Sequence, residues 1–316
     1  MLDFFAQNTM FITFVSSLTA LAICIVVGYI GRKVNILTDE VNMGLSSLLI
    51  KITLPCVIFI SMMRPFSRTL LLESLATLFL SGIVYLSGYF IGGWLARLMG
   101  AGDSEKKVWQ FSFIFANVGY MGFPIIYAIF GYEGMIYTSM ANVAFNVLAF
   151  TLGVQLYKKD NSGITRANLK SIILSPALVA IYIGFIFFLT GLRLPATVHN
   201  GVELIGSMTT PLSMLLVGAI LAKSRLLSLV NDFRVLPVIF IRLLAIPLVT
   251  FFILRMFVHN HLMLSIIVIL AAMPAAAITV IFAEQYKGDT ETASKLVALS
   301  SLLCLITIPL ISLVLS

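Results

Sequence analysis

Apolar segments long enough to cross a bilayer recur along the whole chain, and short polar connections separate them. A transmembrane helix needs about 20 mostly apolar residues. Ten segments meet this requirement: 9–31, 42–63, 70–98, 108–130, 133–157, 171–191, 200–222, 234–257, 262–284 and 291–315. Because 60% of the residues are hydrophobic and only 10% are charged, no sizeable soluble domain fits between these segments. The sequence therefore predicts an all-α polytopic membrane protein with ten transmembrane helices.

Lysines and arginines gather in every second connection between the segments. The most basic connection is KKDNSGITRANLK at 158–170, between the fifth and sixth segments. Since cytoplasmic connections carry the excess of basic residues, we expect this set in the cytoplasm and both termini outside it, in the cell (inner) membrane. This topology explains the net charge of +7 without a nucleic-acid partner.

The same connection divides the chain into two halves, 1–157 and 171–316, with a short cytoplasmic linker between them. Each half has five segments, so the second half enters the membrane from the opposite side, which is the condition for an inverted repeat. Prolines occupy corresponding segments: Pro55 and Pro211 lie in the second segment of their halves, and Pro124 and Pro274 in the fourth. The sequence therefore favours two inverted five-helix repeats.

The fourth and ninth segments contain residues that interrupt helices. The fourth reads FANVGYMGFPII at 115–126, and the ninth contains AAMPAAAI at 271–278. Proline has no backbone N–H and glycine disfavours a helix interior, so both segments are predicted to unwind near the bilayer midplane and to cross. Half-helix N-termini favour anions. The predicted substrate site comprises Asn117, Gly119, Tyr120, Gly122 and Pro124 from one elbow and Met273, Pro274, Ala275 and Ala276 from the other.

The motif FANVGYMGFPII, the following Gly-Tyr-Glu-Gly at 131–134 and the asparagines of the fifth segment resemble the auxin efflux carrier family. Bacterial members include permeases for malate, malonate and similar carboxylates. The resemblance implies a scaffold domain from segments one, two, six and seven, and a transport domain from the others that moves like an elevator. It also implies a homodimer formed through the scaffold. The connection at 158–170 is far shorter than the central loop of the plant members, which makes auxin a doubtful natural substrate.

Other polar residues lie at membrane depth. Asn142 and Asn146 share a helix face, where they either contact substrate or join neighbouring helices. Lys51 is central in its segment and is expected to attract an anion or to form an ion pair. Thr210 offers a hydroxyl for substrate or ion contact. Arg242 lies nearer the cytoplasmic end of its segment, where its side chain can snorkel toward water more readily.

Positive charges at depth, with no paired carboxylates among them, favour an anionic substrate. The sequence therefore predicts a secondary transporter of small organic anions, either mono- or dicarboxylates or auxin-like acids. Two alternatives stay open: a ligand-binding membrane sensor with a transporter-like fold, and a sodium-coupled carrier of the bile-acid type. Coupling to Na⁺ or H⁺ also stays open. No catalytic or metal-binding motif is present, so we expect neither an enzyme nor a resident cofactor.

Overall fold

The computed structural model describes residues 2–157, 170, 173–223 and 234–315, with side chains from residue 16 onward. Within these residues the regular structure is helical. Seven helical stretches of this part are long and apolar enough to cross a membrane: Ser16–Lys33, Asp39–Met62, Arg68–Leu98, Val118–Tyr157, Ala196–Ala222, Val235–Leu254 and Thr290–Leu315. The prediction of an all-α polytopic membrane protein is confirmed at this level. Apart from Lys170, the predicted linker lies outside the described residues.

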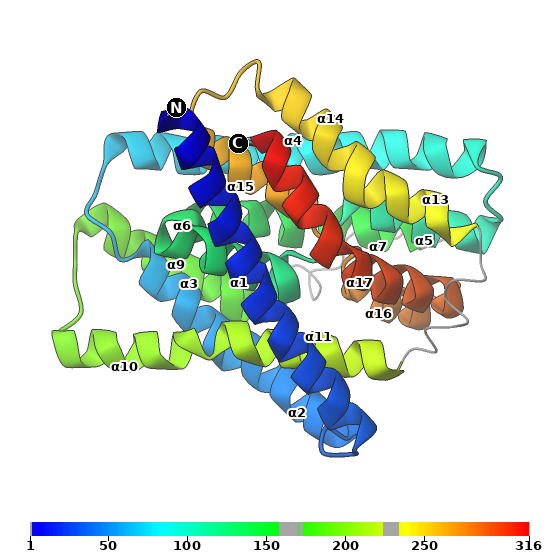
Figure 1. Cartoon of the computed structure of the whole chain (residues 1–316), viewed down its shortest axis with the longest axis horizontal. Coiled ribbons are helices and arrows are strands. Elements are labelled where there is room, and N and C mark those ends of the chain that lie inside the picture. Colours follow the sequence, from blue (N-terminus) through cyan, green and yellow to red (C-terminus); the bar gives the residue numbers. More distant parts are fainter. Residues whose placement is uncertain (1, 158–169, 171–172, 224–233, 316) are drawn as a thin grey trace.

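The long helix α1 (Leu2–Lys33) packs against α11 (Thr209–Lys223), as Figure 1 shows. Two glycines allow this close approach. A Cβ atom on Gly28 would lie 2.1 Å from the carbonyl oxygen of Leu215, and one on Gly218 would lie 2.0 Å from that of Ile25. Small residues at such contacts let helix backbones touch in a membrane, where tight packing drives helix association.

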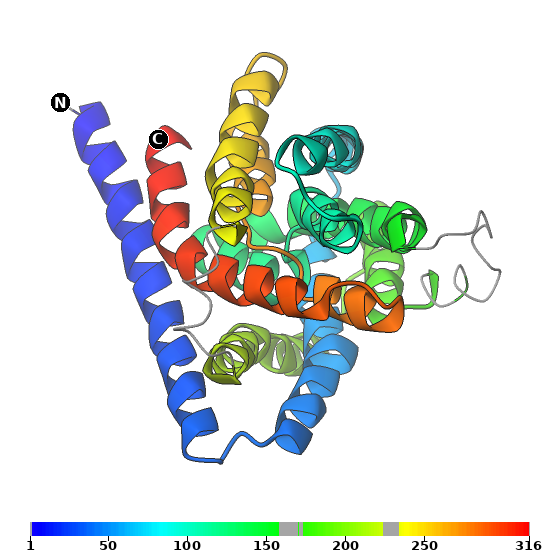
Figure 2. The ribbon, with the colours of Figure 1, turned by 90° about the vertical axis from the view of Figure 1, so that its right-hand side faces the viewer.

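A second group of helices packs around α3 (Leu54–Met62), which follows α2 (Asp39–Leu48). Helices α9 (Pro176–Thr190) and α10 (Ala196–Ser207) both pack against α3. α10 continues into α11 after a break at Met208. The helices α2 and α11 lie on one side of the C-terminal helix α17 (Thr290–Leu315), and α14 (Ile246–Leu254) lies on the other side (Figure 2).

The remaining helices form the other side of the molecule. α4 (Arg68–Leu98) packs against α5 (Asp103–Ile114) and α6 (Phe123–Leu148), and α14 packs against α15 (His261–Ala271). Three further short helices are α7 (Val154–Tyr157), α13 (Val235–Phe240) and α16 (Ile278–Gln285). α4 exposes Phe79, Phe90 and Trp94. Large apolar side chains on a continuous outer face suit contact with lipid.

Prolines shift the helical hydrogen bonding at three places. The π-helical turns η1 (Leu49–Thr53), η2 (Val118–Gly122) and η4 (Ile241–Ala245) each end two residues before a proline, and the prolines are Pro55, Pro124 and Pro247. In each turn the residue before the proline donates to the carbonyl five residues earlier, as Leu54 does to Leu49. A proline cannot donate and its ring crowds the carbonyl four residues back, so one wider turn accommodates it. A fourth π-helical turn, η3 (Ala149–Gly153), has no such proline.

The segments differ from the prediction at several boundaries. The predicted fourth and fifth segments share α6, which bends at Gly131 (φ 58°, ψ −149°) and has no loop there. The predicted sixth segment shortens to the 15 residues of α9. The fourth and ninth segments are interrupted, so neither forms one long helix. For these reasons the described helices give seven candidate spans and not ten.

Candidate functional site

The two interrupted segments meet through their backbones. α5 ends at Ile114 and α15 at Ala271, and a short extended stretch follows each helix. The N–H of Asn117 donates to the carbonyl oxygen of Pro274 at 2.9 Å, and the N–H of Ala276 donates to that of Phe115 at 3.1 Å. Ala116 and Ala275 thereby form an isolated antiparallel bridge. At each break some backbone groups have no hydrogen bond within their own helix. The two breaks bond to each other and so satisfy these groups, which is necessary because lipid offers no partners.

Asn117 caps the half-helix that leaves the crossing. Its Oδ1 accepts a hydrogen bond from the N–H of Tyr120 at 3.2 Å. An N-cap of this kind satisfies one of the orphan donors at a helix start. The side chain is 6% exposed, and because the cap uses Oδ1, only the Nδ2 group is left to donate to a ligand. Asn117 therefore has a structural role as a helix cap, besides the substrate contact that was predicted for it.

The second elbow is held by a residue that the sequence reasoning missed. Ser300, from α17, accepts a hydrogen bond from the N–H of Ala275 at 3.1 Å. Its hydroxyl also contacts the carbonyl oxygen of Val297 at 3.3 Å. Ser300 is 1% exposed. The only sequence signal is a pair of serines, Ser300 and Ser301, inside an apolar segment, and such serines usually bond to their own helix.

The glycines of the first elbow have different surroundings. A Cβ on Gly122 would lie 3.0 Å from Cδ2 of Leu270, so this glycine permits close packing of the two broken helices. A Cβ on Gly119 would have no neighbour within 4 Å. Tyr120, which follows it, is partly buried against the cluster of Leu49, Leu212 and Leu216, together with leucines of α2. Tyr120 therefore faces the α2–η1–α11 side of the crossing.

The other elbow residues are buried and have little polar surface. Pro124 is the second residue of α6, and the wider turn η2 that precedes it accommodates its missing N–H. Met273, Pro274, Ala275 and Ala276 are all buried. The N–H of Met273 donates to the carbonyl oxygen of Leu270 at 3.3 Å, which closes the end of α15. Recognition of a polar ligand by this elbow therefore depends on backbone groups.

The two asparagines of α6 differ in their contacts. Asn142 is 4% exposed, and Nδ2 of Asn146 donates to the backbone oxygen of Asn142 at 2.8 Å. Phe145 lies between them and packs edge-on against Phe115, with ring centroids 5.7 Å apart. This contact places the Asn142–Asn146 stretch beside the first elbow. Asn146 uses Nδ2 for a hydrogen bond within α6. Of the two asparagines, Asn142 is the more deeply buried.

The basic and hydroxyl residues predicted for the site lie apart from the bridge. Lys51 is exposed on η1, and Thr210 is partly buried at the start of α11, where its carbonyl accepts from Ser213 Oγ at 2.9 Å. Its neighbour Thr209 is 2% exposed, and among the described residues its hydroxyl has no hydrogen-bond partner.

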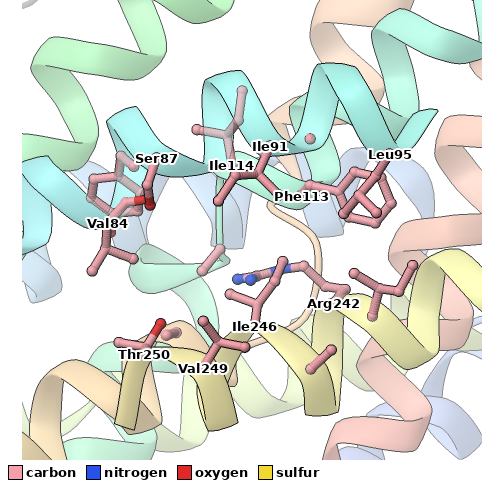
Figure 3. A pocket seen from close by; sticks show the side chains of 17 residues that line it. Val84, Ser87, Ile91, Leu95, Phe113, Ile114, Arg242, Ile246, Val249 and Thr250 are labelled. Atoms are coloured by element: carbon pink, nitrogen blue, oxygen red, sulfur yellow. The ribbon is translucent and has the colours of Figure 1, made fainter. Parts of the chain in front are cut away.

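Arg242 corrects a prediction. Its side chain does not snorkel to water, because it is 2% exposed and lies under α4 and α5. It belongs to η4 and lines a cavity together with residues of α4, α5 and α14 (Figure 3). A helical wheel or a depth estimate does not reveal this placement, since it depends on how α4 covers η4.

Interrupted helices that meet inside a bundle of membrane helices are typical of secondary transporters, whose sites lie where broken helices converge. The chain matches the model of the family described as membrane transport protein over residues 13–312. The chain therefore belongs to the membrane transport protein family, the auxin efflux carrier family that its motifs resemble. A family of membrane transporters is consistent with the expectation of no enzymatic activity.

Relatives with similar lengths support this membership. An uncharacterized transporter of Methanothermobacter thermautotrophicus is 27% identical over 307 residues, which cover 95% of this chain and 98% of the relative. An uncharacterized transporter of Methanocaldococcus jannaschii is 23% identical, with 91% and 94% covered. The uncharacterized transporter YfdV of Escherichia coli K12 is 22% identical, with 94% and 96% covered. The similarity therefore extends over nearly the whole of each chain.

Proposed function

We propose that this protein is a secondary transporter of small organic anions, namely mono- or dicarboxylates, and that it binds them at the helix crossing. The observation that carries the proposal is the paired bridge at Ala116 and Ala275, from which two half-helices begin. The side-chain donors beside it are Nδ2 of the buried Asn117 and the hydroxyl of the partly buried Tyr120. Donor groups at helix N-termini stabilise negative charge.

The packing of the helices supports an elevator-type movement. α1 packs against α11, and α3 packs against α9 and α10, so these helices support one another as the scaffold that we propose. α4, α5, α6 and α13 to α17 would move as the transport domain. Tyr120 contacts the leucine cluster of Leu49, Leu212 and Leu216 at the boundary between the two groups. This contact is apolar, whereas the hydrogen bonds from Tyr132 to Glu203 and from Ser17 to the carbonyl oxygen of Ala128 also join the two groups and would break during the movement.

The proposal also includes two inverted five-helix repeats, a homodimer formed through the scaffold, and an extracytoplasmic position of both termini. Two of the three proline-linked π-helical turns, η1 and η2, lie in the first half, and η4 lies in the second. The coupling ion, Na⁺ or H⁺, is tested by the transport assay below.

The decisive experiment is uptake by proteoliposomes that contain the purified protein. Radiolabelled malate, malonate, acetate and indole-3-acetate would be offered separately, with and without a sodium gradient or a proton gradient. Uptake of at least one carboxylate above protein-free liposomes supports the proposal. Saturable binding without uptake under any gradient would favour a sensor and would contradict transport.

A further inference from the structure

A cavity of about 150 Å³ lies behind the crossing, between α4 and the η4–α14 segment. Its walls come from α4, α5, η4 and α14 (Figure 3), and Ala116 and Ala271 also line it. No residue of α2, η1 or α11 lines it. The cavity is therefore separate from Tyr120, which packs against those helices.

The guanidinium group of Arg242 extends into this cavity, as Figure 3 shows. Among the described residues, neither Nε nor Nη2 of Arg242 has a hydrogen-bond partner. These two nitrogens lie on one edge of the guanidinium plane, with parallel N–H bonds. That edge matches the two oxygens of a carboxylate in a bidentate contact.

The walls offer nothing to neutralise this charge. None of the described residues that line the cavity is acidic, and most of them are aliphatic. The polar side chains are Tyr85, Ser87 and Thr250, and the hydroxyl of Ser87 donates to the carbonyl oxygen of Val84 at 2.8 Å. A buried charge without a partner carries a large desolvation penalty. The arrangement is incomplete without an anion.

The local fold holds Arg242 in this position. The wide turn of η4 precedes Pro247, and the N–H of Ile246 donates to the carbonyl oxygen of Ile241. Opposite it, Gly88 and Gly92 of α4 carry no side chain, and a Cβ on Gly88 would lie 3.2 Å from Cα of Ile114. A Cβ on Gly92 would likewise lie 3.0 Å from Cβ of Phe113, so these glycines bring α4 close to α5, and the two helices together cover Arg242.

We propose that this cavity is a second anion site, which binds a carboxylate on Nε and Nη2 of Arg242 and the apolar body of the acid against Val84, Ile114 and Ile246. At about 150 Å³ the cavity is well above the space that one water requires, and it fits a short acyl chain. Ile91 and Val249, which also line the cavity, are 51% and 53% exposed, so we place its mouth between them. The acid therefore comes either from solution or, as a fatty acid, from the bilayer.

The test measures binding and not transport, so that it is independent of the function proposed above. Purified protein would be titrated with butyrate, with its neutral isostere butyramide, and with oleate in nanodiscs, while the thermal unfolding midpoint is recorded. We expect butyrate or oleate to raise the midpoint saturably and butyramide to leave it unchanged. Butyrate alone would identify a soluble acid as the ligand, and oleate alone a bilayer fatty acid.

Variants assign the binding to the cavity. Arg242→Met should abolish the stabilisation, and Arg242→Lys should weaken the affinity at least tenfold, because an ammonium group cannot form the planar fork. Arg97→Met, which removes an exposed cation from the end of α4, is the matched control and should bind as the wild type does. Asn117→Ala, at the crossing, should also retain this binding.

Val249→Trp provides a test that leaves Arg242 in place. The bulky side chain at the mouth should weaken binding at least tenfold, and since Val249 is exposed, the variant should fold even if Arg242→Met does not. Three results would overturn the proposal: no charge-dependent stabilisation of the wild type, equal binding by Arg242→Met, or unchanged binding by Val249→Trp.

Discussion

The backbone N–H of Asn117 donates to the carbonyl oxygen of Pro274 at 2.9 Å and so joins two segments from opposite halves of the chain. The proline cannot donate, but its carbonyl is available because α15 has already ended at Ala271. Asn117 meanwhile uses its side chain to cap the following turn. Asn117 thus links the stretch that follows α15 to the helical turn η2, which begins directly after Asn117.

Asn117→Ala is expected to lower both stability and transport. Loss of the N-cap bond to Tyr120 should destabilise the protein by about 1 kcal/mol. If Nδ2 also contacts the substrate, the initial uptake rate in proteoliposomes should fall at least tenfold, which corresponds to about 1.4 kcal/mol.

The matched control for this variant is Ser67→Ala. Ser67 caps α4 through a hydrogen bond from the N–H of Leu70 at 3.4 Å, away from the crossing. It should lose similar stability and keep its uptake rate. Equal loss of uptake in the two variants would mean that Asn117 acts through stability alone.

Ser300→Ala should destabilise the second elbow. Without the hydroxyl, the buried N–H of Ala275 loses its 3.1 Å acceptor, and an unsatisfied buried donor costs about 1–3 kcal/mol. The thermal unfolding midpoint measures the loss. Ser301→Ala, one residue further along α17, is the comparison, and a midpoint equally low in both variants would speak against the specific contact.

Gly28→Ala should weaken the contact between α1 and α11. The added methyl group would meet the carbonyl oxygen of Leu215 at 2.1 Å, so the helices must separate, at a cost of about 1–3 kcal/mol. Gly82→Ala is the control, because nothing lies within 4 Å of a Cβ at that position of α4. Yield of folded protein after size-exclusion chromatography distinguishes them, and normal yield of Gly28→Ala would refute the close contact.

Gly131→Ala should strain the bend within α6. The residue has φ 58° and ψ −149°, a conformation that other residues adopt at a cost of about 1–3 kcal/mol. Gly201→Ala in α10 has open space around it and a helical backbone, and should gain up to about 1 kcal/mol. Unfolding midpoints that move in the same direction would show that Gly131 carries no backbone strain.

The interruptions of the fourth and ninth segments could be read from the chain because proline and glycine act locally. FANVGYMGFPII and AAMPAAAI each contain a residue that no ordinary helix interior accommodates at low cost. The same local reasoning placed a boundary near residue 131, where the structure has a bend at Gly131 and no loop. A single glycine can turn a helix without ending it, which periodicity does not reveal.

The surroundings of single polar residues within apolar segments were harder to predict from the sequence. Arg242 was expected to reach water, yet it lies buried beside α4, and the contact of Ser300 with Ala275 was not foreseen. Depth along a helix can be estimated from sequence, but the direction of a side chain relative to distant helices cannot.

The sequence alone determined that this chain is an all-helical membrane protein, because its apolar segments are too long and too many to be hidden from water in a soluble domain. It also indicated that the fourth and ninth segments are interrupted, because proline and glycine are unfavourable in a helix interior, but it did not distinguish them from Pro55 and Pro247, where a π-helical turn keeps the helix continuous. Only the tertiary structure decided that the two breaks pair at Ala116 and Ala275, and that Arg242 faces a cavity. Those arrangements depend on packing between segments far apart in the chain, for which local residue chemistry supplies no constraint.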